Sequence, residues 1–134
     1  MAQNQQAVID YYNRSESKKG YNLFLHGTKH FGYYNRGDSR WQFQKAMRQM
    51  EEQLANAIAL PEGSKILDAG CGVGDVASYL ASHKGYQVDG IDILDFNIEE
   101  AKKRIETRGL GDLVHVQLMS YQELKFPAKS FDAT

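Results

Sequence analysis

The chain has 134 residues, 42% of them hydrophobic and 25% charged, which suits one globular domain with one core. Its 16 Lys and Arg nearly balance its 17 Asp and Glu, so the net charge gives no reason to expect nucleic acid or an anionic membrane as a partner. No apolar run approaches the roughly 20 residues of a membrane span, and one cysteine excludes an intrachain disulfide. The cytoplasm is the default location.

The first part of the chain, residues 1–60, is rich in Gln, Asn, Tyr and charged residues and predicts a helical region. Residues 5–18 indicate a first helix of modest apolar periodicity. An aromatic, glycine-containing stretch at 21–37 follows without a clean period, which predicts a loop or short helical turns.

A longer helix is predicted next, with Asp38 or Ser39 as its N-cap and with Pro61 and Gly63 ending it. Apolar side chains recur there at three- and four-residue spacing, at Phe43, Ala46, Met47, Met50, Leu54, Ala57 and Ile58. We expect Trp41 and Phe43 to pack this N-terminal helical cap onto the sheet.

Residues 61–134 alternate strand and helix signals with short connections, which is typical of a parallel α/β sheet. The predicted strands are 65–69, 87–91 and 114–119, and the predicted helices are 73–83 and 94–108. After a loop at 121–129, residues 130–134 approach a fourth strand without completing it. The expected fold is therefore a Rossmann-like α/β core, truncated after about three parallel strands, behind an N-terminal cap.

A strand that ends in Asp68 runs directly into alternating glycines at Gly70, Gly72 and Gly74. Such a loop lets the backbone approach a ligand at the carboxyl end of the sheet, next to a helix N-terminus. A tight turn without a ligand would need one glycine rather than three, so the pattern favours a nucleotide site.

Two kinds of nucleotide fit the glycines. Residues 72–77 also match the dinucleotide pattern G-x-G-x-x-A. The Asp68 carboxylate would repel a pyrophosphate held by the loop, whereas it would attract the ammonium and sulfonium of S-adenosylmethionine. Asp92 ends the next strand about 20 residues later, where an acidic residue reaches the ribose hydroxyls of either cofactor.

The segments L-D-A-G-C-G-V-G-D at 67–75 and V-D-G-I-D-I at 88–93 resemble motifs of the class I methyltransferases, which depend on S-adenosylmethionine (SAM). The resemblance covers about 60–134 and implies that the methionine portion is held by Asp68, Gly70, Cys71, Gly72 and Gly74. It also implies that Asp92 binds the ribose, that Ile93 packs on the adenine, and that Ser120 and Tyr121 lie at the adenine edge. Ser120 stands where the family often has an acidic residue.

The segment H-F-G-Y-Y at 30–34 is similar to an aromatic segment of sterol, tocopherol and cyclopropane-type enzymes. The resemblance implies that Tyr33 helps to cover SAM and that the acceptor is a small, lipid-like or isoprenoid molecule. Cys71 is interpreted as a small loop residue rather than a nucleophile. His26 and His30 lack the rest of a zinc motif, so no metal is predicted.

The predicted activity is direct transfer of the SAM methyl group, with S-adenosylhomocysteine (SAH) as the product and with no catalytic residue identifiable. Without a fourth strand, the first strand would expose an unpaired edge, so we expect self-association or a longer protein, and a chain that is inactive alone. An NAD(P)-dependent oxidoreductase fragment and a non-catalytic, methyltransferase-like interaction domain remain as alternatives.

Overall fold

A computed structural model of the protein describes residues 2–13 and 31–134. The strands are β1 (Lys65–Ala69), β2 (Gln87–Asp92) and β3 (Val114–Leu118). The helices are α1 (Ala2–Asn13), α3 (Phe43–Ile58), α4 (Asp75–Lys84) and α5 (Asp95–Thr107). Each helix or strand that the sequence predicts between residues 65 and 119 is present, with its ends within two residues of those in the structure.

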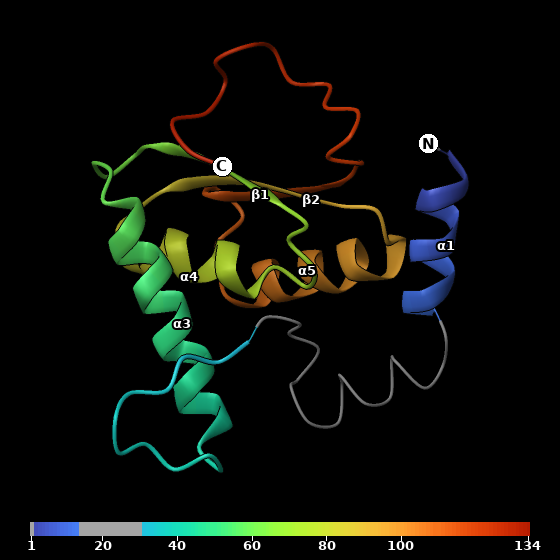
Figure 1. Cartoon of the computed structure of the whole chain (residues 1–134). Helices are drawn as coiled ribbons and strands as arrows, with labels where there is room; N and C mark the ends of the chain where they lie inside the picture. The colour runs from blue at the N-terminus through green and yellow to red at the C-terminus, as the bar shows by residue number, and fades with distance from the viewer. Residues whose placement is uncertain (1, 14–30) are drawn as a thin grey trace.

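The three strands form one parallel sheet in the order β1-β2-β3. Helices α4 and α5 cover one face of this sheet, and the segment that follows β3 arches over the other side (Figure 1). Each helix connects two neighbouring parallel strands, so the carboxyl ends of β1 and β2 meet at one edge. The predicted Rossmann-like α/β fold, truncated and with an N-terminal helical cap, is confirmed.

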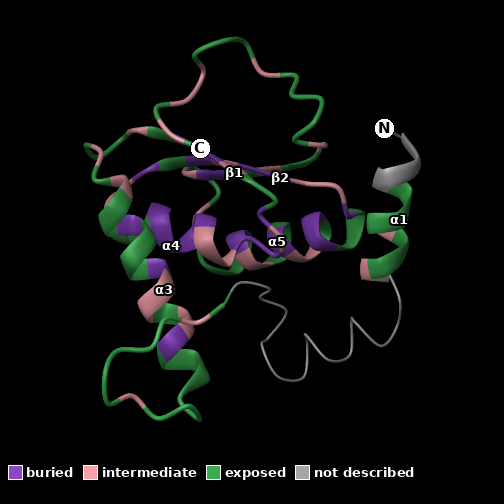
Figure 2. Cartoon of the chain, viewed as in Figure 1, coloured by how far each residue is buried: buried purple, intermediate pink, exposed green. Residues whose placement is uncertain are grey.

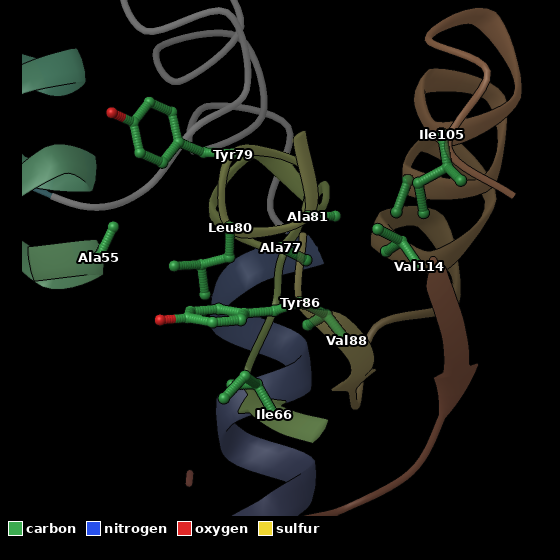
Figure 3. Close-up of a cluster of buried hydrophobic side chains, with 11 residues drawn as sticks. Ala55, Ile66, Ala77, Tyr79, Leu80, Ala81, Tyr86, Val88, Ile105 and Val114 are labelled. Carbon is green, nitrogen blue, oxygen red and sulfur yellow. The ribbon is translucent and has the colours of Figure 1, made fainter. Parts of the chain in front are cut away.

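The core lies between the sheet and its two helices, where the buried positions concentrate (Figure 2). Ile66, Val88 and Val114 come from the three strands and stand side by side in the sheet register. They belong to one cluster with Leu80 of α4 and Ile105 of α5 (Figure 3). Burial of each such side chain is worth about 1.5–3 kcal/mol, so this layer stabilises the sheet whose strand ends carry the site.

Tyr86 anchors the connection between α3 and the sheet. Its side chain is 1% exposed, and its hydroxyl donates to the Leu60 carbonyl at 2.9 Å while accepting from the Leu60 N–H at 3.1 Å. A phenol can do both because its oxygen is donor and acceptor at once.

The free edge of β1 differs from the prediction. Ile66 forms a parallel bridge with Ala133, and the Leu67 N–H donates to the Ala133 carbonyl at 3.0 Å. The Lys65 N–H also donates to the Asp132 carboxylate at 2.8 Å. The expectation of a bare β1 edge is therefore wrong for its first half, where the C-terminal residues lie beside it (Figure 1). Self-association through the rest of that edge stays a prediction.

The N-terminal cap also differs in detail. Helix α3 begins at Phe43 after Gln42, so neither Asp38 nor Ser39 is its N-cap. Its buried positions are Ala46, Glu51 and Ala55. Trp41 is 80% exposed and Phe43 49%, so the expectation that they pack the cap onto the fold is wrong. Helix α3 contacts α4, and its Ala55 belongs to the buried cluster that also contains Leu80 of α4.

Asp38 instead fastens the segment before α3 to that helix. Its carboxylate accepts hydrogen bonds from the Asn35 N–H, the Lys45 ammonium and the Gln49 amide. These donors, Lys45 first, hold the pKa of the Asp38 carboxyl below its usual value. Asp38, which the sequence indicated as an N-cap, thus accepts three hydrogen bonds in the segment before the start of the helix.

The first predicted helix, residues 5–18, corresponds to α1 over Ala2–Asn13. Its predicted continuation at 14–18 lies outside the described residues, as does most of the predicted loop at 21–37. No helix within the described ranges 2–13 and 31–134 is long and apolar enough to cross a bilayer.

Candidate functional site

The glycine loop joins β1 to α4, and its three alternating glycines all have positive φ: +98° at Gly70, +54° at Gly72 and +78° at Gly74. A side chain would be strained in each of these conformations, which explains why the loop uses glycine. A Cβ at Gly70 or Gly72 would meet nothing within 4 Å. The space next to these two residues is thus open, and both of them line a cavity.

The loop is tied to the end of β2. The N–H groups of Gly70 and Cys71 both donate to the Ile91 carbonyl, at 2.8 and 2.9 Å. The Gly72 N–H donates to Asp92 Oδ2 at 2.9 Å. These three loop N–H groups already donate to acceptors at the end of β2, whereas the first-turn N–H groups of α4 have no intrahelical acceptor. An anionic group in this region would find its donors at the helix start.

Asp92 closes β2 and faces the cavity. Besides the bond from Gly72, its Oδ1 accepts from the Leu94 N–H at 2.8 Å. The two bonds fix the orientation of the carboxylate, and each oxygen keeps a further lone pair. A half-buried, fixed carboxylate of this kind accepts readily from a pair of neighbouring hydroxyls.

The cavity has a volume of about 350 Å³, which is within the range of small-molecule sites. Its walls combine the glycine loop, the end of β2, the start of α5, the end of β3 and one side of α1. The lining residues are Val8, Tyr12, Gly70, Gly72, Ile91, Asp92, Ile93, Leu94, Asn97, Met119 and Tyr121. Most of these side chains are apolar, so the cavity suits a flat apolar ring with a few polar groups.

Asn97 is the buried polar residue of this cavity. It is 2% exposed, in the first turn of α5, and its Oδ1 has no hydrogen-bond partner within the described ranges. A buried acceptor in that state costs free energy until a donor reaches it.

Among the residues predicted from sequence, the structure brings Gly70, Gly72, Asp92, Ile93 and Tyr121 together around the cavity. Asp68 and Gly74 belong to the same strand and loop without lining it. Ser120 lies in the turn after β3, where its hydroxyl accepts from the Gln122 N–H at 3.2 Å. Met119 takes the cavity position next to it.

Tyr33 lies elsewhere. Its N–H donates to the Ala46 carbonyl at 2.8 Å, which holds its segment against α3, and its side chain is 41% exposed. It does not line the cavity. The aromatic residue that does so from the N-terminal region is Tyr12, with Val8 one turn earlier on α1.

Cys71 is buried in the loop and 8% exposed. Its Sγ lies close to Gly90 of β2, where an added Cβ would be only 2.9 Å from the sulfur. Burial, followed by the nearby charges of Asp68 and Asp92, raises the pKa of its thiol. The thiol is thus protonated and a poor nucleophile at neutral pH.

His26 and His30 lie outside the described residues. In the described part of the chain, no group of three or more His, Cys, Asp or Glu side chains could hold a metal ion.

Residues 66–134 match the family described as methyltransferase domain. The S-adenosyl-L-methionine-dependent Diels-Alderase iccD of Talaromyces variabilis is 44% identical over 131 residues, which are 96% of this chain and 44% of that protein. The sterol 24-C-methyltransferase of Yarrowia lipolytica is 34% identical over 104 residues, which are 78% of this chain and 26% of that protein.

Among solved structures, the crystal structure of the [4+2]-cyclase SpnF matches with a TM-score of 0.84 at 26% identity. The match covers 96% of this chain and 47% of that one. The chain thus spans about half, or less, of the length of these relatives.

Proposed function

The chain belongs to the methyltransferase domain family, and we propose that it forms the SAM-binding part of an enzyme that transfers a methyl group to a small-molecule acceptor. The acceptor class that we favour is lipid-like or isoprenoid, since sterol 24-C-methyltransferases are among the relatives. The product cofactor would be SAH.

One observation carries this proposal: the Asp92 carboxylate and the glycine loop converge on one cavity with apolar walls. The residues fit SAM in three respects. Asp92 would accept from the ribose hydroxyls, Ile93 and Leu94 would pack on the adenine, and the open space beside Gly70 and Gly72 would take the methionine portion. The carboxylate of Asp68 suits the positive charges of SAM, whereas it would repel a pyrophosphate.

SAM, when bound, supplies an electrophilic methyl group on a sulfonium, so the protein need not provide a nucleophile of its own. The chain's own residues would bind and orient the cofactor and exclude water from it. Val8 and Tyr12 of α1 would close the outer side of the cavity. A general base for the acceptor is assigned to none of the described residues.

The test is calorimetric titration of the chain with SAH and, separately, with NADH. Micromolar binding of SAH alone supports the proposal. Binding of NADH alone would replace it with an NAD(P)-dependent oxidoreductase fragment, and binding of neither would favour a non-catalytic, methyltransferase-like interaction domain.

A second activity is favoured by a specific observation. One relative at 44% identity is named a SAM-dependent Diels-Alderase, and the solved structure with a TM-score of 0.84 is a [4+2]-cyclase. The same cofactor site could therefore serve a cyclisation in which the methyl group is not transferred. Conversion of SAM to SAH in the presence of acceptor distinguishes the two, because only methyl transfer consumes SAM.

The remaining proposals concern organisation and surroundings. We place the boundary between the N-terminal cap and the SAM-binding half-domain near residue 60, and we propose a cytoplasmic location. The near-neutral charge supports a small molecule rather than nucleic acid as the partner. Size-exclusion chromatography with light scattering tests self-association through the second half of the β1 edge.

A further inference from the structure

Arg104 of α5 and Arg108, the residue that follows this helix, both pair with Asp75, the first residue of α4. Asp75 Oδ2 accepts from Arg104 Nη1 at 2.9 Å, and Asp75 Oδ1 accepts from Arg108 Nη2 at 2.7 Å. The two arginines are one helical turn apart, so each reaches one oxygen of the same carboxylate. Asp75 is 13% exposed and Arg104 22%, so this pairing is partly shielded from solvent and from salt.

Asp75 follows the last glycine of the loop, and that glycine also touches α5. A Cβ at Gly74 would stand 3.2 Å from the Cβ of Ala101, which is 0% exposed. No side chain separates the loop from the helix at this point. The two arginine pairs thus hold the loop end against α5 at a contact where the backbone has little room to shift.

Helix α5 also carries the other end of the proposed cofactor site. It begins at Asp95, directly after the turn in which the Leu94 N–H binds Asp92. Asn97, in its first turn, lines the cavity. One rigid helix therefore connects the adenosine side of the site, at its N-terminal end, with the glycine loop, which it holds through residues of its second half.

We propose that Asp75 is a positioning residue that sets the glycine loop at the right distance from Asp92 through its pairs with Arg104 and Arg108. It does not line the cavity and would not touch the cofactor. This inference rests on the proposed function, because it assigns the methionine portion of SAM to the glycine loop and the adenosine portion to Asp92.

The variant Asp75→Asn keeps the size of the side chain and removes its charge. Glu100→Gln is the matched control, because Glu100 pairs with the Nε of the same Arg104 at 3.0 Å and, among the described residues, does not bond to Asp75 or the glycine loop. Arg108→Gln is a milder second variant, since Arg108 is 42% exposed and its replacement removes only one of the two ion pairs of Asp75.

Each protein is titrated with SAH and with 5′-methylthioadenosine, which lacks the amino-acid portion. Asp75→Asn should weaken SAH binding about tenfold, as for a lost charge-assisted pair. It should leave methylthioadenosine binding within about twofold, since the adenosine contacts are unchanged. Arg108→Gln should give a smaller loss in the same pattern, and Glu100→Gln no loss.

Amide hydrogen exchange in the absence of ligand is the second readout. Exchange at Gly72 and Gly74 should accelerate in Asp75→Asn and stay unchanged in Glu100→Gln. Equal weakening of both ligands, or unchanged loop exchange, would overturn the positioning role. Failure of the unsubstituted chain to bind SAH would overturn the proposed function instead, and the exchange data would still decide the role of Asp75.

Discussion

Asp92 Oδ2 accepts a hydrogen bond from the Gly72 N–H at 2.9 Å, which ties the end of β2 to the loop that follows β1. Gly72 lies in the loop after β1, Asp92 ends the neighbouring parallel strand β2, and both line the same cavity. The carboxylate thus has a structural partner without any ligand. Its remaining lone pairs leave a second task, which is to accept hydrogen bonds from a ligand.

Replacing Asp92 with Asn tests that second task. Asn keeps an oxygen for only one of the Gly72 and Leu94 N–H groups, and its amide nitrogen faces the other N–H as a second donor. It also removes the charged acceptor for two ribose hydroxyls. We expect SAH affinity, measured by calorimetry, to fall about 10- to 100-fold.

Asp89→Asn is the control for Asp92, because Asp89 lies on the same strand and does not line the cavity. Its SAH affinity should equal that of the unsubstituted chain. Unchanged affinity in Asp92→Asn would remove Asp92 from the cofactor site.

Asn97→Leu should separate stability from binding. The substitution removes a buried acceptor that has no partner within the described ranges and keeps the volume of the side chain. The free energy of unfolding in urea should therefore stay level or rise by about 1 kcal/mol without ligand. The increase in Tm produced by SAH should shrink, because the cavity wall loses a polar side chain. A destabilised variant with full SAH response would show that Asn97 serves packing alone.

Tyr86→Phe should lower the free energy of unfolding by about 1–2 kcal/mol, because the N–H and the carbonyl of Leu60 both lose their partner. Urea unfolding measures the change. The control is Tyr34→Phe, whose hydroxyl makes only a 3.5 Å contact with the Arg40 carbonyl on the surface and should cost less than about 0.5 kcal/mol. SAH binding should be the same in both variants, and a loss in Tyr86→Phe would link this anchor to the site.

Much of the site could be predicted because its signals are local. Gly70 and Gly72 follow one strand and Asp92 ends the next, and parallel strands bring their carboxyl ends to one edge. The contributions of Val8 and Tyr12 could not be predicted, because the docking of a terminal helix over a sheet edge leaves no local pattern. Asn97 gives the same signal as any polar residue in a first helical turn. Its burial becomes visible only in three dimensions.

The face of α3 shows a different limit. Phe43 and Leu54 continue the apolar spacing that predicted a buried stripe, yet they are 49% and 41% exposed. Helical periodicity tells which residues share a face, but it does not tell which neighbour covers that face. In the described structure, Ala55 packs in the cluster that holds Tyr79 and Leu80 of α4, whereas Ala46 lies against the segment at Gly32 and Tyr33.

The Cys71 thiol makes stability depend on pH in the alkaline range. Its folded-state pKa is raised by burial first and then by Asp68 and Asp92, so the folded chain keeps the proton that the unfolded chain releases above about pH 8.5. The stabilisation is complete below that value and declines as the pH rises beyond it. Between pH 8 and 9.5 the free energy of unfolding should fall by about 1 kcal/mol, and Cys71→Ala should remove this part of the decline.

Alkylation provides the independent check on Cys71. Iodoacetamide at pH 8.5 should modify the native chain far more slowly than the urea-unfolded chain, because only the thiolate reacts and the native thiol is both protonated and 8% exposed. SAH should slow the reaction further by holding the glycine loop closed over the sulfur. Native-state alkylation at the unfolded rate, or the same pH profile in Cys71→Ala, would mean that the thiol is not shielded by the loop and that another group causes the alkaline decline.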